Sequence, residues 1–453
     1  MASIGKRDMT VGPEWKHILL FSLPLMAGHI LQQLYNTVDG IVVGNFVSQN
    51  ALAAIGSAGT LAFIFLAVAI GYSNGAGIMV AQLFGAKLYD ELKSAVSTAL
   101  ILLLSMGVCF SVLGFFGARL LLHGLMNVED GDVLQYAVRY FAIYALGLVF
   151  QFTYNAVTAI LRAVGDSQAT LYFLLVSSVL NFVLDMVFVI VFHWGVAGAA
   201  AATVLSQVAC AGISLVYMFR KYPVFRFKRG EFVFQRDKCG MCLRMGVPNT
   251  IQQSIVSFGN VFTQRLVNSF GAEAMAAYTV GVRMEGYLFV PALGLSVGMA
   301  TFTAQNIGAG RIDRVKRGCR GGTVISLAIA FTLELLSYIF APQISALFGV
   351  AGEALTLSVS YVRFLAFFFW MFALYILLSG LFQGSGDVIF AMAGSLVSLA
   401  VRVVMAYVMA LGFGMGFASV WWAMPMGWLC CLAMALIRYF TGGWKEKGIV
   451  NHG

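Results

Sequence analysis

The chain has 453 residues, of which 60% are hydrophobic and only 10% charged, and its formal net charge is +9. Because soluble domains carry about 25% charged residues, this composition excludes a soluble globular protein and predicts an integral membrane protein. A basic chain could also bind nucleic acid. Here the cations cluster at one side of the apolar runs, which favours membrane orientation and contact with anionic lipid, so we expect membrane lipid and no nucleic acid among the partners.

Taken in chain order, twelve apolar runs reach the ~20 residues needed to cross the hydrocarbon core. The predicted spans are 17–44, 51–84, 94–116, 133–158, 170–192, 196–219, 241–268, 274–305, 321–341, 355–380, 389–411 and 417–440. Lipid offers the backbone no hydrogen-bond partner, and the runs lack the alternation of a membrane barrel. The sequence therefore predicts an all-α integral membrane protein with twelve transmembrane helices. The first span is too long for a signal peptide, and we expect it to be retained.

The orientation follows from the basic residues. Of the 28 Lys and Arg residues, 22 fall in segments that are cytoplasmic if the N-terminus is cytoplasmic. This positive-inside distribution predicts a multi-pass protein with both termini in the cytoplasm.

Several function classes find no support. The seven cysteines lie in spans or on the inner face, so no disulfide framework is predicted. The pair Cys239 and Cys242 has metal or redox spacing, but no second pair or histidine accompanies it, and we expect no metal site there. No GxxxxGK[ST] motif occurs, which excludes a phosphate loop for ATP. We expect no cofactor and no enzymatic activity.

The two halves of the chain have similar sequences, which indicates an internal repeat. Pro24 matches Pro248 at an offset of 224, "AQLFGA" at 81–86 matches "AQNIGA" at 304–309, and Gly165-Asp166 matches Gly386-Asp387 at an offset of 221. An offset that drifts only in loops indicates a duplicated unit. We predict an N-lobe at 1–219, a cytoplasmic linker at 220–240 and a C-lobe at 241–453. Each unit holds six spans, an even number, so the predicted lobes are related by a pseudo-two-fold axis along the membrane normal.

Repeated prolines and glycines suggest how the helices bend and pack. Pro24 and Pro248 each remove a backbone donor inside a span, which predicts helix bending. Small residues four apart allow close approach of another helix. The repeated pairs of this kind are Gly71 with Gly75 and Gly294 with Gly298.

The duplication fails at three polar positions, which locates special chemistry in the first lobe. The second-lobe equivalents are Thr263 for Asp39, Arg402 for Asn181 and Ala406 for Asp185. An acid inside the membrane costs about 2.5–3.5 kcal/mol on insertion scales, so it needs partners or a use.

Spacing and depth predict one polar cluster in the first lobe. Tyr35 precedes Asp39 by four residues and Asn181 precedes Asp185 by four, so each pair shares a helix face. Thr203 lies at a similar depth in the sixth span. Gln32 lies on the face of Tyr35 and Asp39, one turn closer to the cytoplasm. Such a cluster can bind and release a proton, hold Na⁺ at Asp39 and Asp185, or serve only as a buried hydrogen-bond network.

The second lobe instead carries Arg283, Glu285 and Arg402 at comparable depth. Buried cations need partners, and Glu285 is a candidate partner for Arg402. Arg283 and Glu285 are two residues apart and would not face each other on one helix. We expect a structural or gating ion pair, with a role in substrate handling as the alternative.

At this point the residues are similar to a known family. "LPLMAGHILQQLYNTVDGIVVG", the repeated "AQxxGA", "GVPNTIQQS" and Asn181-x-x-x-Asp185 resemble the MATE (multidrug and toxic compound extrusion) transporters of bacterial type, in particular the DNA-damage-inducible branch. The resemblance implies a two-lobe antiporter in the bacterial inner (cytoplasmic) membrane. It implies export of organic, cationic or amphipathic drugs and toxins in exchange for H⁺ or Na⁺, by alternating access.

The resemblance also assigns residues. By motif position, the N-lobe cation-coupling cluster of that branch carries over to Tyr35, Asp39, Asn181, Asp185 and Thr203. Another branch places acids in the seventh and tenth spans, where this chain has Arg265 and Arg363 and no acid. We therefore expect coupling in the N-lobe, and a monomer.

Two alternatives stay open. A flippase or transporter of lipid-linked or lipid-like substrates in the same superfamily would share the architecture. A membrane-embedded enzyme could in principle use Asp39 with Asp185 as an aspartyl pair, although neither residue sits in a recognisable protease motif.

Overall fold

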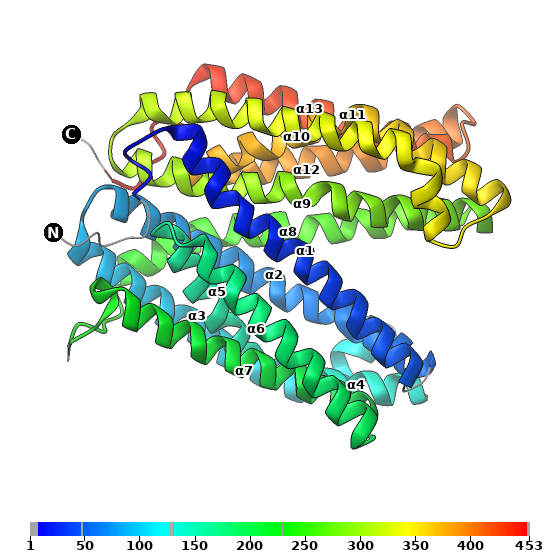
Figure 1. Cartoon of the computed structure of the whole chain (residues 1–453), viewed down its shortest axis with the longest axis horizontal. Helices are drawn as coiled ribbons and strands as arrows, with labels where there is room; N and C mark the ends of the chain where they lie inside the picture. Colours follow the sequence, from blue (N-terminus) through cyan, green and yellow to red (C-terminus); the bar gives the residue numbers. More distant parts are fainter. Residues whose placement is uncertain (1–7, 47–48, 127, 129–130, 229, 451–453) are drawn as a thin grey trace. The chain divides into compact units, whose positions relative to one another are not determined.

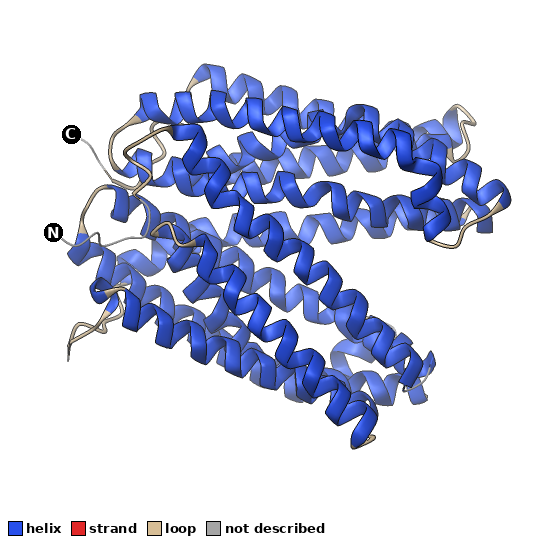
Figure 2. Ribbon diagram, viewed as in Figure 1, coloured by secondary structure: helices blue, strands red, loops and turns tan. Residues whose placement is uncertain are grey.

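The structure is a computed structural model that describes residues 8–46, 49–126, 128, 131–228 and 230–450. It does not describe the side chains of residues 34–46, 49, 50, 52, 125, 256–258 and 260. Helices and the turns between them make up the described residues, which contain no strand (Figures 1 and 2). The first half of the chain holds α1 (Glu14–Phe46), α2 (Gln49–Gly85), α3 (Tyr89–Arg119), the π-helical turn η1 (Leu120–Leu125), α4 (Asp132–Leu146), α5 (Leu148–Ala163), α6 (Ser167–Asp185), the π-helical turn η2 (Met186–Val191) and α7 (Gly195–Lys221). The second half holds the 3₁₀ turn η3 (Pro223–Phe225), α8 (Arg236–Asn268), α9 (Ala272–Gly308), α10 (Ile312–Leu347), α11 (Gly352–Ser385), α12 (Val388–Tyr407), the π-helical turn η4 (Val408–Gly412) and α13 (Ala418–Thr441).

The predicted all-α membrane architecture is confirmed. Nine helices among the described residues are long and apolar enough to cross a membrane, and the bent pair of α4 with α5 raises the number to ten. The two other predicted spans, 17–44 and 241–268, lie within the 33-residue helices α1 and α8.

The predicted span 133–158 is a bent pair of helices, and the bend was not predicted. The segment forms two helices, α4 and α5, bent by 48° at Gly147. A Cβ atom at Gly147 would collide with Oε1 of Gln207 and lie 3.0 Å from Cγ2 of Val204, so the glycine allows α7 to pack closely at the bend. Hydropathy does not register such a bend, because the residues on both sides of Gly147 are equally apolar.

Packing divides the chain into two units. The first combines Met1–Asp8 with Ala27–Thr250, and the second combines Met9–Met26 with Ile251–Gly453. Helices α1 and α8 therefore each contribute to both units. The two crossing points, after Met26 and after Thr250, have the same offset as Pro24 and Pro248, which stand inside α1 and α8 two residues earlier. The predicted lobe boundaries at 219 and 241 stay a prediction, and the contact units differ from them in these two helices.

In the first unit, the repeated glycines of α2 pack against the first half of α8. A Cβ at Gly71 would collide with Thr250, and a Cβ at Gly75 would come within 2.7 Å of the Gly246 backbone nitrogen. The expected close approach of a helix to this pair is confirmed.

In the second unit, the equivalent glycines of α9 pack against the first half of α1. A Cβ at Gly294 would reach 2.5 Å from Cγ of Met26, and a Cβ at Gly298 would collide with Oγ of Ser22. The same sequence signal thus makes the same kind of helix crossing in each repeat, which is the packing expected for small residues four apart.

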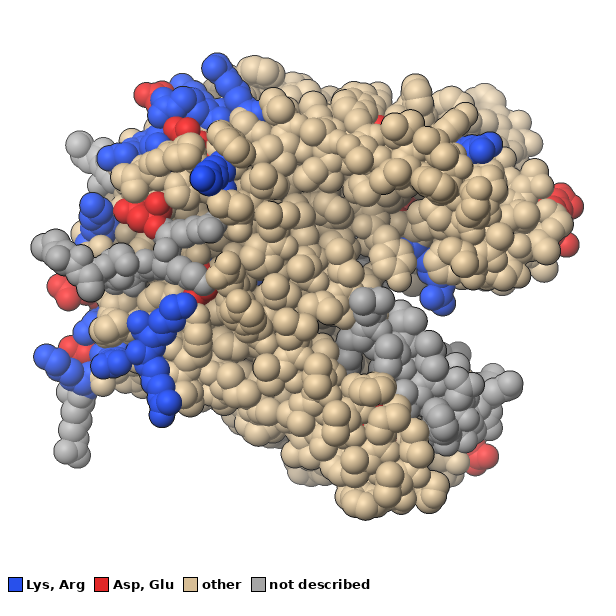
Figure 3. All heavy atoms as spheres, in the orientation of Figure 1, with Lys and Arg blue, Asp and Glu red and all other residues tan. Residues whose placement is uncertain are grey.

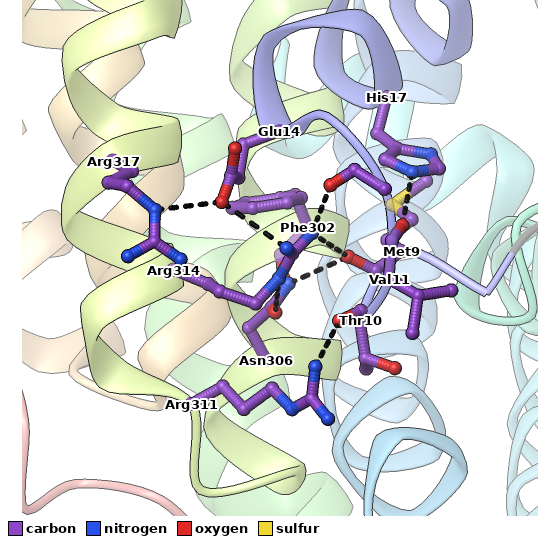
Figure 4. Close-up of polar contacts among 11 residues, drawn as sticks. Met9, Thr10, Val11, Glu14, His17, Phe302, Asn306, Arg311, Arg314 and Arg317 are labelled. Carbon is purple, nitrogen blue, oxygen red and sulfur yellow. Dashed lines mark hydrogen bonds and ion pairs between the residues drawn. The ribbon is translucent and has the colours of Figure 1, made fainter.

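Polar groups at the ends of α9 and α10 hold the residues that precede α1 (Figure 4). The backbone N–H of Met9 donates to Oε1 of Gln305 at 2.9 Å, and Nδ2 of Asn306 donates to the Met9 carbonyl oxygen at 3.3 Å. Gln305 and Asn306 belong to the second "AQxxGA" copy. That motif therefore has a structural role in this unit, since both side chains are buried and bind backbone.

Arginines of the same region complete the anchor. Arg311 donates to the Thr10 carbonyl at 2.8 Å and Arg314 donates to the Gly12 carbonyl at 2.8 Å. The Glu14 carboxylate pairs with Arg314 at 3.2 Å and with Arg317 at 2.9 Å (Figure 4). On the face drawn in Figure 3, Lys and Arg side chains lie mostly over the left ends of α3 and α7 in the first unit and of α10 in the second.

Candidate functional site

The core of the candidate site stands on α6. Asn181 and Asp185 lie one helical turn apart on this helix, and each side chain is only 2% exposed. The helix begins at its capping residue Asp166, whose carboxylate accepts from the Ala169 N–H, and it ends at Asp185. A π-helical turn follows directly. A similar turn follows α12 in the second unit, so we read it as part of the duplicated scaffold.

Thr203 of α7 completes the described part of the cluster. Nδ2 of Asn181 lies 3.5 Å from Oγ1 of Thr203, and this hydroxyl donates to the Ala199 carbonyl oxygen at 3.0 Å. The structure thus brings Asn181 and Thr203 together and buries Asp185 one turn away. Their role in cation coupling stays a prediction.

The remaining first-lobe residues stand on α1. The side chains of Tyr35 and Asp39 lie outside the described residues, so their meeting with Asp185 stays a prediction. Gln32, one turn earlier, is exposed within the first unit.

The second unit shows what replaces this cluster. Arg402 and Met424, the repeat equivalents of Asn181 and Thr203, also contact each other, with Nη1 of Arg402 3.4 Å from the Met424 sulfur. Asp39 and Asp185 are replaced by Thr263 and Ala406, both buried. The Thr263 hydroxyl donates to the backbone oxygen of Gly259 at 3.0 Å.

Gly259 is itself the repeat equivalent of Tyr35. A Cβ at Gly259 would lie 2.9 Å from Nη2 of Arg402, so these two positions are neighbours in the second unit. The glycine leaves room for the long arginine side chain. A Cβ there would also collide with Cδ1 of Leu399, so a tyrosine at 259 would require both neighbours to move.

The second-lobe charges are arranged around Tyr361. Its hydroxyl donates to Oε1 of buried Glu285 at 2.7 Å, and Arg402 lies within electrostatic range of that carboxylate. Arg283 is exposed while Glu285 is buried, so the two occupy different faces of α9, as predicted. Whether this group acts as a gate or only as a structural pair stays a prediction.

Two buried acidic residues and their hydrogen bonds were not predicted from the sequence. The first is Glu334 on α10, which is 9% exposed and accepts the backbone N–H of Trp370 on α11 at 2.6 Å. It lies in the predicted span 321–341, where a single acid barely changes the hydropathy. A search for charged residues inside every span would have found it.

The second is Asp166 at the end of the first unit. This fully buried carboxylate accepts from Tyr222 at 2.6 Å and from Tyr217 and Lys221 at 2.9 Å. Burial opposes ionisation, but the hydrogen bonds from Tyr222, Lys221 and Tyr217 outweigh it and lower the pKa of Asp166. Its repeat equivalent Asp387 accepts from Arg438 at 2.8 Å. The repeated Gly-Asp pair was the available signal.

Metal-binding chemistry finds no support in the described part of the chain. It holds no group of three or more His, Cys, Asp or Glu side chains that could bind a metal ion. Cys239 and Cys242 are free thiols on α8.

Comparisons with known proteins point to one family. A family model described as MatE matches residues 24–187 and 248–408. These segments begin at equivalent positions of the two repeats, so each repeat carries one copy of the family unit. The chain is 31% identical to the probable multidrug resistance protein YoeA of Bacillus subtilis (strain 168), across 96% of both chains.

More distant relatives agree. The probable multidrug resistance protein NorM of Thermotoga maritima is 25% identical, across 96% of this chain and 94% of that one. A solved structure described as the outward-facing conformation of a multidrug resistance MATE family transporter has a TM-score of 0.91 and 24% identity. It covers 98% of this chain and 99% of that chain, and this likeness establishes the fold.

Proposed function

The chain belongs to the MatE family, and from that premise we propose that it is a secondary active multidrug efflux antiporter. It exports organic, cationic or amphipathic compounds in exchange for H⁺ or Na⁺ by alternating access. Coupling runs through the first-lobe carboxylates Asp39 and Asp185, with Tyr35, Asn181 and Thr203 around them. The protein works as a monomer in the bacterial inner membrane, with both termini cytoplasmic.

The observation that carries this proposal is the buried polar face of α6. Asp185 and Asn181 are 2% exposed inside a strongly apolar helix, and Thr203 of α7 lies against Asn181. An acid buried at this depth is costly and marks ion or substrate pathways in membrane proteins. Carboxylate, amide and hydroxyl oxygens can hold a proton or coordinate a hard monovalent cation.

The second unit supports the placement of Tyr35 in the same cluster. Positions 259 and 402, which correspond to Tyr35 and Asn181, are neighbours there. Because the two units share helix packing at the glycine crossings and at the Asn181–Thr203 position, the same adjacency is expected in the first unit. The acidic cluster would then be confined to one lobe, since the equivalent positions of the second lobe hold Gly259, Thr263, Arg402, Ala406 and Met424 and no acid.

The mechanism follows from electrostatics. When Asp39 and Asp185 share a low-dielectric site, two uncompensated negative charges repel strongly, so a bound H⁺ or Na⁺ stabilises the cluster. Release of that cation leaves charge that a cationic substrate or water must compensate. Binding of cation and of substrate therefore favour different states, which is the thermodynamic requirement for exchange.

The proposal is tested by export from everted vesicles under an imposed pH gradient and, separately, a Na⁺ gradient. We expect Asp39→Asn and Asp185→Asn to abolish gradient-driven export at equal expression. The matched control is Asp132→Asn, an exposed acid in the first turn of α4, which should export like wild type. Undiminished export by both cluster variants would overturn the coupling role.

The coupling ion is decided by a second measurement. Substrate-induced proton release from purified protein, lost in Asp39→Asn, would identify H⁺. Strict dependence of export on a Na⁺ gradient at fixed pH would identify Na⁺.

A further inference from the structure

One tertiary hydrogen bond occurs in both units at equivalent positions. In the first unit the backbone N–H of Val149 on α5 donates to Oγ of Ser111 on α3 at 3.2 Å. In the second unit the backbone N–H of Trp370 on α11 donates to Oε1 of Glu334 on α10 at 2.6 Å. Ser111 corresponds to Glu334 by the offset of the "AQxxGA" motifs, and Val149 corresponds to Trp370 by the offset of the Gly-Asp pairs.

The backbone differs between the two sites. Val149 is the second residue of α5, after the bend at Gly147, and an N–H in the first turn of a helix has no partner in its own helix. Ser111 therefore caps α5 from a neighbouring helix. Trp370 instead lies midway along the unbroken helix α11, where a backbone N–H ordinarily serves the carbonyl four residues earlier. There the acceptor from the neighbouring helix is a carboxylate.

The surroundings of Glu334 are apolar. Leu288, Ala292, Ala330, Phe369 and Ala373 form a buried cluster, and Trp370 packs against it. Glu334 lies inside the predicted span 321–341 of α10, about 10 Å along the helix from the end of that span. An acid there costs about 2.5–3.5 kcal/mol on insertion scales.

No described charge compensates this acid. Helices α9 and α11 pack against α10, and their charged residues are Glu273, Arg283, Glu285, Glu353 and Arg363. Among the described residues none of these forms an ion pair with Glu334. Nε of Arg363 donates to the Tyr338 carbonyl oxygen instead, one turn further along α10.

The first unit shows that the hydrogen bond does not require an acid. A serine makes it at the equivalent site, without a buried titratable group. Compared with a hydroxyl, the carboxylate has a longer reach, is a stronger acceptor when ionised and can bind a proton reversibly. The last of these properties makes the hydrogen bond sensitive to pH.

We propose that Glu334 is a second proton-binding site, in the second lobe, whose occupancy controls the hydrogen bond to α11. As an anion, the carboxylate is a strong acceptor for the Trp370 N–H. When a proton binds one carboxyl oxygen, the group becomes a weaker acceptor and gains an O–H donor. Proton binding thus loosens the link between α10 and α11.

Only the effect of Glu334 on transport depends on the proposed antiport function, and proton binding at Glu334 can be tested separately. The proton binding itself is read by infrared difference spectroscopy of purified protein in lipid nanodiscs, titrated between about pH 5 and 9, a range that buried carboxyl groups can reach. We expect a protonated-carboxyl band that disappears in Glu334→Gln and in Glu334→Ser. The second variant installs the residue of the first unit.

The controls separate this site from the first-lobe cluster. Glu353→Gln, an exposed acid in the first turn of α11, should keep the band, and so should Asp185→Asn. If export is lost in Asp185→Asn while the band persists, coupling and the second site are independent. If the same band persists in both Glu334 variants, the proposal is refuted, whatever the export assay shows.

The link to α11 has its own readout. Amide hydrogen exchange at Trp370 should be about fivefold faster in Glu334→Gln than in wild type at high pH, because a neutral acceptor is weaker by ~1 kcal/mol. Glu353→Gln should leave this amide unchanged. Equal exchange in wild type and Glu334→Gln would show that the charge of residue 334 does not control the bond.

Discussion

Replacement of Asp166 by asparagine tests the energetics of the duplicated Gly-Asp site, because the second lobe provides a matched comparison. Asp166 is fully buried and accepts from two tyrosine hydroxyls and Lys221, and it also caps α6 through the Ala169 N–H at 3.3 Å. An asparagine can keep the Oδ1 cap of Ala169, but it puts an amide NH2 in place of the Oδ2 that accepts from both tyrosines and Lys221, and it loses the charge.

The expected magnitude follows from these contacts. Each tyrosine hydroxyl must then accept from the amide NH2, which exchanges a hydrogen bond to a charged acceptor for a neutral one that is weaker by ~1 kcal/mol, and two hydroxyls are affected. The ion pair adds ~0.5–1 kcal/mol, since the Lys221 side chain is 36% exposed and screened. We therefore expect Asp166→Asn to destabilise the protein by about 3 kcal/mol. Asp387→Asn should cost only ~1 kcal/mol, because Arg438 is the one side chain described as donating to that carboxylate.

The assay is equilibrium unfolding of both purified variants and wild type in the same detergent, followed by tryptophan fluorescence. Asp166→Asn should unfold at clearly lower denaturant than Asp387→Asn. Equal losses in the two variants, or a larger loss for Asp387→Asn, would falsify the additive reading of the tyrosine hydrogen bonds.

Three further predictions follow from other contacts. Because the pKa of Asp166 is lowered from its ordinary value of 3.8, the stabilisation is complete above that pH and is lost as pH falls through the folded pKa; wild type should approach Asp166→Asn in acid titrations, and a constant difference down to full protonation would contradict this. Gly298→Ala should destabilise by about 1–3 kcal/mol through overpacking against α1, whereas Gly56→Ala, whose Cβ meets nothing, should be neutral or stabilising in thermal melts. Arg314→Ala should accelerate limited proteolysis before α1 because it releases the Gly12 carbonyl, while Lys316→Ala, with a 44% exposed side chain, should not.

Much of the fold could be predicted from the sequence because it rests on long-range periodicities. Apolar runs located the twelve spans, and the drifting offset revealed the duplication. The glycine pairs indicated close helix approach, and Gly75 and Gly298 do receive another helix. The bend at Gly147 could not be predicted, since hydropathy measures composition and carries no information about backbone direction.

The candidate site was predicted in outline by the failure of the repeat symmetry. That comparison found Asn181 and Asp185, and the structure places Thr203 beside Asn181. Glu334 was not predicted because a single acid barely changes the hydropathy of its span. Its hydrogen bond to Trp370, and the equivalent bond of Ser111, could not be predicted because they depend on which backbone N–H groups of α5 and α11 face α3 and α10. The tyrosines around Asp166 were likewise invisible, because 51 and 56 residues separate them from it.

Helices α1 and α8 each begin in one packing unit and end in the other, and this exchange has a consequence for biogenesis. Residues 9–26 are synthesised before α9, yet the α9 glycines against which they pack, Gly294 and Gly298, follow more than two hundred residues later. During synthesis, therefore, the first half of α1 lacks its native packing partners until the second half of the chain has been made. A chain severed between α7 and α8 would yield two fragments that each hold the other's missing piece, so neither should mature alone and both should assemble when co-expressed.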